Sequence, residues 1–165
     1  MKYRLFPVPL ALLLVAASPA QPGRISDDVS EASLRSIVER LVSFGTRHTL
    51  SSQTDPKRGI GASLRWTEQE FRRYARACRG CLAIETPSDV VTGRRVPTPT
   101  KVTDVLAIQR GSVDPNRVVI ISGHIDSRVT DVMDFTRDAP GANDDGSGTA
   151  AAIEAARVLS KHRFP

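Results

Sequence analysis

Two short segments carry side chains that could bind a divalent metal ion. One reads Gly-His-Ile-Asp-Ser at residues 123–127, and the other reads Ala-Pro-Gly-Ala-Asn-Asp-Asp-Gly-Ser-Gly at residues 139–148. Zinc accepts histidine nitrogens and carboxylate oxygens as ligands. His124 could ligate such an ion, and Asp126 could hold the proton of its other ring nitrogen. A carboxylate of the second segment, Asp144 or Asp145, could bridge two metal ions that activate water for hydrolysis.

Each segment also has a purely structural interpretation. An isolated His-x-Asp is most often a turn histidine beside a capping aspartate. Asp144 and Asp145 precede an expected helix, where acidic residues favour the helix dipole. Four nearby residues nevertheless indicate tight backbone geometry around these acids: Pro140, Gly141, Gly146 and Gly148. The combination shifts the balance towards a metal site.

The apolar pattern predicts three helices. One begins at Ser30, its expected N-cap, and stops near Gly45. A second is expected over residues 58–78, with its charged side chains on the opposite face. A third is expected over residues 148–161, with Ser147 as its cap.

Extended segments are expected between the second and third helices. Residues 82–85 and 102–109 favour strands, and the proline-containing stretch 87–100 favours a loop or an edge hairpin. Residues 117–122 contain the run Val-Val-Ile-Ile, which is typical of a strand buried on both faces. His124 would then follow the carboxyl end of this strand, where open α/β sheets bind ligands. Helices around buried strands predict a three-layer α/β/α domain with a mixed, mostly parallel sheet.

The first twenty residues have the pattern of a secretory signal peptide. Two cations precede an apolar run over residues 10–17, and small residues lead up to Ala20. The run is too short to span about 30 Å of hydrocarbon, so no stable membrane anchor is expected. We expect cleavage near Ala20 and a secreted or periplasmic location. A flexible lead over residues 21–29 would precede the folded part of the chain at residues 30–165.

The charge balance gives no support for nucleic-acid binding. Removing Lys2 and Arg4 with the signal peptide lowers the formal charge from +5 to +3. The remaining cations are scattered and have few aromatic neighbours, whereas nucleic-acid-binding proteins gather both on one face. A solvated surface is the better interpretation.

Cys78 and Cys81 are the only cysteines and form Cys-Arg-Gly-Cys. A redox pair normally begins a helix after a strand, whereas this pair would end one. A structural zinc site needs four ligands, and the chain has no second cysteine pair. A local disulfide fits an exported protein best, and free thiols are the next alternative.

Together these motifs resemble the secreted co-catalytic dizinc aminopeptidases of metallopeptidase family 28. Residues 123–127 and 139–148 carry the resemblance, and weaker similarity extends back through residues 43–48 and 58–62 to about residue 31. The resemblance implies a zinc-aminopeptidase-like fold, two Zn²⁺ ions and peptide or protein N-termini as substrate. It predicts no oligomeric state.

The resemblance also assigns roles to individual residues. His124 would ligate one zinc, Asp144 would bridge both, and Asp126 would be the hydrogen-bond partner of His124. Asn143 occupies a position that is often Asp in the family and is not a ligand. Asp145 would be structural, at the start of the helix.

The family's general base is expected to be absent from this chain. Its adjacent Glu pair, a further Asp and a second His ligand would all follow the last expected helix. Glu154 lies inside that helix, His162 is expected to be solvated at its end, and His48 is expected to be a loop residue. We therefore expect an N-terminal portion, incomplete at the C-terminus and inactive alone. The alternatives are a non-catalytic exported remnant or binding domain, and a glutaminyl-cyclase-like enzyme on the same scaffold.

Overall fold

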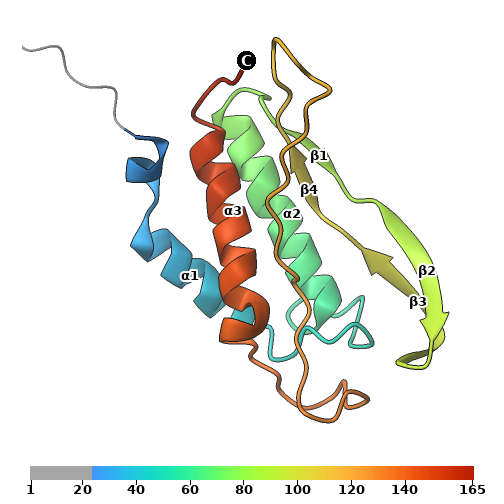
Figure 1. Ribbon diagram of the computed structural model, residues 1–165. Helices are drawn as coiled ribbons and strands as arrows, with labels where there is room; N and C mark the ends of the chain where they lie inside the picture. The colour runs from blue at the N-terminus through green and yellow to red at the C-terminus, as the bar shows by residue number, and fades with distance from the viewer. Residues whose placement is uncertain (1–23) are drawn as a thin grey trace, which may run out of the picture.

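The computed structural model describes residues 24–165, so the expected signal peptide lies outside the described residues. Three long helices lie side by side, with α3 between α1 and α2, and the strands lie beyond α2 (Figure 1). The helices are α1 (Glu31–Val42), α2 (Ile60–Ala77) and α3 (Ser147–Leu159). The strands are β1 (Ala83–Glu85), β2 (Ser88–Gly93), β3 (Val96–Thr103) and β4 (Leu106–Ile108). None of the helices within residues 24–165 has the length and apolarity that a membrane span needs.

The three predicted helices are confirmed, with small differences at their ends. The Ser33 amide donates to Ser30 Oγ at 3.2 Å, so Ser30 is the N-cap of α1 as expected. The cap predicted at Ser147 is wrong. Gly146 is the N-cap of α3, with φ −59° and ψ −33°, so Ser147 is already the first helical residue, and its hydroxyl donates to the Asn143 carbonyl at 3.0 Å.

One apolar cluster joins the three helices to the first strand. Ile37 and Leu41 on α1 meet Phe71 and Tyr74 on α2 and Ile153 on α3, and all are buried. These positions recur at intervals of three or four residues, which places them on one face of each helix. The buried apolar faces hold α3, and hence the loop that precedes it, in place.

The mixed α/β composition is confirmed, but the strands pair differently from the prediction. β1 pairs with β4 in antiparallel register, with Ala83 opposite Ile108. β2 and β3 form an antiparallel hairpin that extends away from the helices (Figure 1), so the edge-hairpin alternative for residues 87–100 is confirmed. No parallel pair and no sheet of more than two strands occurs within residues 24–165.

The buried strand predicted over residues 117–122 is wrong for this structure. The segment is irregular and has no strand partner in the described part of the molecule. Figure 1 draws it as a plain trace between β4 and α3. Val118, Val119, Ile120 and Ile121 are 73%, 84%, 79% and 55% exposed. The apolar run predicts burial only if neighbouring strands cover it, and none of the strands at residues 83–108 does so.

The expected flexible lead contains a 3-10 turn over Ile25–Asp28 that docks on the end of α3. Arg157 Nη2 donates to the Asp28 carbonyl at 2.6 Å. His162 Nε2 lies 3.2 Å from the Asp28 carboxylate, and Lys161 Nζ lies 3.5 Å from it. His162 is therefore half-buried in an ion cluster, which corrects the expectation of a solvated residue.

Glu154 is 2% exposed and links α3 to the start of α1. Its carboxylate accepts hydrogen bonds from the Ser30 amide at 2.8 Å and from the Ser33 hydroxyl at 2.7 Å. It also accepts two hydrogen bonds from Arg157 at 2.5 and 2.7 Å. Burial by itself would raise the pKa of Glu154. The hydrogen bonds from Arg157, Ser33 and Ser30 outweigh burial and lower the pKa to about 2.

Glu154→Gln should destabilise the fold at neutral pH by about 3 kcal/mol, because it removes one partner of a buried ion pair. The lowered pKa means that ionised Glu154 stabilises the fold above its ordinary pKa and loses this effect as the pH falls towards 2. Urea unfolding at pH 7 and pH 3 should therefore show a smaller difference between variant and unaltered chain at pH 3. Glu39→Gln on the exposed face of α1 is the control. A constant difference at both pH values would contradict this role.

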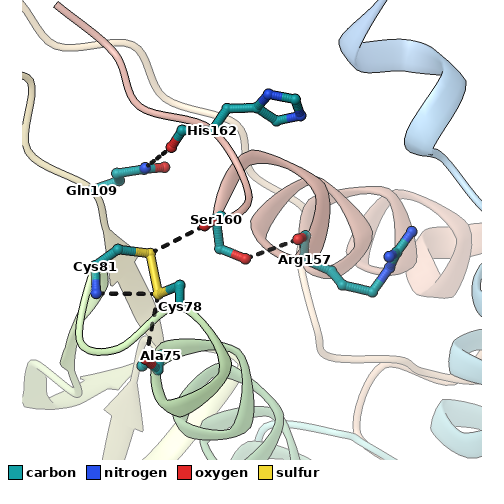
Figure 2. The surroundings of a disulfide bond; sticks show 7 residues. All are labelled: Ala75, Cys78, Cys81, Gln109, Arg157, Ser160 and His162. Carbon is teal, nitrogen blue, oxygen red and sulfur yellow. Dashed lines mark hydrogen bonds between the residues drawn. A yellow bond between two sulfur atoms is a disulfide. The ribbon is translucent and has the colours of Figure 1, made fainter. Parts of the chain in front are cut away.

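Cys78 and Cys81 form a disulfide at the end of α2, with their Cα atoms 5.5 Å apart. Figure 2 shows that this bridge faces the end of α3, where Cys81 Sγ lies 3.4 Å from the Ser160 carbonyl oxygen. The Cys81 amide donates to Cys78 Sγ at 3.1 Å. The bridge thus fixes the turn between α2 and β1 next to the C-terminal end of α3.

Candidate metal site

The imidazole of His124 lies between two carboxylates. Nδ1 is 3.3 Å from Asp126 Oδ1, and Nε2 is 3.1 Å from Asp144 Oδ1. All three side chains are open to solvent, and that of Asp144 is 82% exposed. The structure therefore brings together the three residues that the sequence singled out, although Asp144 is separated from the other two along the chain.

Asp145 points the other way and bonds to the backbone. Its carboxylate accepts hydrogen bonds from the His124 amide at 3.0 Å and from the Gly148 amide at 3.1 Å. The Thr149 hydroxyl donates to the His124 carbonyl at 2.9 Å. The first turn of α3 thereby fixes the backbone of His124, and Asp145 has the structural contacts expected of it.

The loop before α3 directs the two adjacent aspartates to opposite sides. Gly141 begins the turn with a φ of +49°, a left-handed conformation that glycine adopts without strain. A Cβ at Gly141 would lie 2.5 Å from Ser127 Cβ, so the close approach also requires glycine. Asp144 leaves the helical conformation, with φ −112° and ψ 95°, and the peptide bond to Asp145 is cis. The Asp144 carboxylate faces His124, and the Asp145 carboxylate bonds to backbone amides instead.

The donor set fits zinc in part. When Asp126 accepts the proton of Nδ1, the Nε2 lone pair is free for a metal, and the Asp144 carboxylate faces that same nitrogen. Catalytic zinc sites use three protein ligands and a water. Within residues 24–165, no group of three or more His, Cys, Asp or Glu side chains is arranged to hold a metal ion. His124 and Asp144 therefore amount to two donors of a larger set.

The other candidate ligands are engaged elsewhere. His48 is buried, and its Nδ1 accepts a hydrogen bond from the Leu50 amide at 3.0 Å. Its Nε2 therefore carries the proton and donates to the Val132 carbonyl at 3.1 Å. Glu154 is held by its ion pair with Arg157, and His162 is paired with Asp28. None of these side chains reaches His124.

One residue next to the site was not singled out from the sequence. Arg47 entered only as a member of the weakly similar stretch at residues 43–48, and it lies buried between the two site segments. An arginine in a loop is ordinarily a solvated residue, so its type alone gave no signal. The available sequence indication of a turn here was Gly45, because glycine readily adopts the left-handed conformation, and its φ is +72°.

Comparison with known proteins gives a consistent result. Residues 104–165 match the model of peptidase family M28. A probable zinc metalloprotease of Leptosphaeria maculans is 50% identical over 138 residues, which is 83% of this chain and 32% of the relative. Probable zinc metalloproteases of Pyricularia oryzae and Pyrenophora teres f. teres are also 50% identical, and the matches cover 27% and 29% of their lengths. The chain thus spans about a third of the curated relatives it matches, and the family resemblance seen in the motifs is confirmed.

Proposed function

Because this chain carries sequence of peptidase family M28 and its relatives are named zinc metalloproteases, we propose that it contributes to the zinc site of an aminopeptidase. Such a hydrolase removes residues from the N-termini of peptides or proteins. The pairing of His124 Nε2 with Asp144 at 3.1 Å is the observation that carries the proposal. It joins an imidazole and a carboxylate from two segments at a solvent-open position.

Each site residue has a defined part in this proposal. His124 and Asp144 would hold zinc, and Asp144 would be the carboxylate shared between two ions. Bound zinc supplies an activated water and polarises the peptide carbonyl. Asp126 keeps the His124 proton on Nδ1 and so leaves Nε2 available. Glu154 is not proposed as the general base, because its buried carboxylate is paired with Arg157. Within residues 24–165, no group of three or more His, Cys, Asp or Glu side chains is arranged to complete the ligand set.

The proposed location is outside the cytoplasm. The pattern of residues 1–20 supports export, and so does the disulfide between Cys78 and Cys81, because disulfides persist in oxidising compartments. Neither a nucleic-acid partner nor a membrane anchor is proposed.

A chimera tests the proposed activity. Residues of this chain would replace the matching 138 residues of the Leptosphaeria maculans relative, with the unaltered relative as control. The chimera is expected to release the first residue of an unblocked peptide and to leave the N-acetylated peptide intact. A chelator should abolish this activity, and added zinc should restore it.

Two results would contradict the proposal. Cleavage of the blocked and unblocked peptides at the same internal bond would exclude an aminopeptidase and indicate an endopeptidase. An inactive but folded chimera, beside an active parent, would favour a non-catalytic domain.

A further inference from the structure

Arg47 is buried, at 1% exposure, and its guanidinium bonds to backbone from three parts of the chain. Nε donates to the Ile125 carbonyl at 2.7 Å, and Nη2 donates to the Gly141 carbonyl at 3.0 Å. Nη1 donates to the carbonyls of Leu41 and Pro140, both at 2.9 Å. One side chain therefore connects the end of α1 with both segments that carry the candidate ligands.

These contacts lie next to the site residues themselves. Ile125 separates His124 from Asp126, and Gly141 begins the turn that presents Asp144. Ser127 strengthens the same connection, because its hydroxyl donates to the Ala139 carbonyl at 2.6 Å and accepts from the Arg47 amide at 3.0 Å. Hydrogen bonds from Arg47 and Ser127 thus set the distance between the two segments that carry the candidate ligands.

A buried guanidinium held only by carbonyl oxygens is costly, which favours a specific role over general stability. Burial lowers the pKa of Arg47, and the nearby negative charge of Asp126 raises it. Arginine presents its donors in a rigid planar fork, whereas a lysine ammonium is a single point with a flexible stem. The four carbonyls, on three segments, match the several fixed donors of a guanidinium and do not match a single lysine ammonium.

We propose that Arg47 is a positioning residue that holds the His124 and Asp144 segments at the spacing needed for one metal ion. This inference rests on the proposed zinc site. Loss of the Arg47 guanidinium should therefore separate His124 from Asp144 without unfolding the chain, because the apolar cluster of α1, α2 and α3 does not include Arg47.

Arg47→Lys is the direct test, made in the complete 165-residue chain. Zinc affinity, measured by calorimetric titration with zinc alone, should fall roughly 10–100-fold, as for other residues that orient metal ligands. Hydrogen exchange should accelerate at the amides of Ser127 and Ala139, which bond to the loop around Arg47, and not in the middle of α2. Glu154→Gln is the matched control, since it also breaks a buried charged network but should leave zinc affinity unchanged.

The outcomes separate this inference from the proposed function. Unchanged zinc affinity and exchange in Arg47→Lys, or an equal loss of affinity in Glu154→Gln, would overturn the positioning role. Should the unaltered chain bind no zinc, the exchange pattern alone decides whether Arg47 holds the two segments, and the chimera remains the separate test of the proposed function. Ser127→Ala removes the hydroxyl that bonds to the Arg47 amide and to the Ala139 carbonyl. If Arg47→Lys does not fold, Ser127→Ala gives the same readouts, in the same direction and smaller.

Discussion

Asp144→Ala is expected to abolish zinc binding and to leave the stability of the fold almost unchanged. The Asp144 carboxylate faces His124 Nε2 and is 82% exposed, so its removal costs one of two metal donors and little packing. Zinc titration by calorimetry and urea unfolding of the metal-free chain measure the two effects separately.

Asp145→Ala is the matched control, because it removes a carboxylate from the adjacent position. The Asp145 carboxylate accepts hydrogen bonds from the amides of His124 and Gly148, so this change should destabilise the fold by about 1–3 kcal/mol. Zinc affinity unchanged in Asp144→Ala would remove Asp144 from the ligand set. Equal stability losses in both variants would contradict the division of roles.

The second prediction is that the exposed apolar run at residues 118–121 causes self-association of the chain. Four β-branched side chains and a backbone without a strand partner among residues 24–165 offer a template for pairing with another chain. We expect the purified chain to self-associate as its concentration rises. The double variant Val119→Lys with Ile120→Lys should shift it to the mass of a monomer, as measured by size-exclusion chromatography with light scattering.

Two other exposed valines provide the control for this experiment. Val90 on β2 is 62% exposed, and Val113 in the loop after β4 is 76% exposed. The double variant Val90→Lys with Val113→Lys adds the same charge outside the run and should leave self-association intact. Self-association that is insensitive to the first pair, or equally sensitive to both, would show that residues 118–121 do not drive it.

The helices could be predicted from sequence because their signals are local. Apolar spacing placed α1 and α2 within a few residues, and Ser30 supplied the cap of α1. The strands depend on partners that are distant in sequence. The run at residues 118–121 has the composition of a buried strand, but burial is a property of its neighbours, and the described residues provide none.

In the candidate site, too, the local feature could be predicted from sequence and the long-range contacts could not. His124 and Asp126 are two residues apart, so their pairing could be anticipated from spacing. The approach of Asp144 required the resemblance to a known family, since it depends on the turn at Gly141. Arg47 was missed because its contacts with Ile125, Pro140 and Gly141 bring together segments far apart in the chain.

The most direct test of the zinc assignment is X-ray absorption at the zinc edge of the zinc-loaded chain. We expect the outer-shell scattering pattern of one imidazole together with oxygen ligands, and we expect His124→Ala to remove the imidazole pattern. Zinc bound with the imidazole pattern intact in His124→Ala would show that His124 is not the ligand, because His48 or His162 would then bind the ion. Zinc bound through oxygen alone in the unaltered chain would contradict the zinc assignment equally.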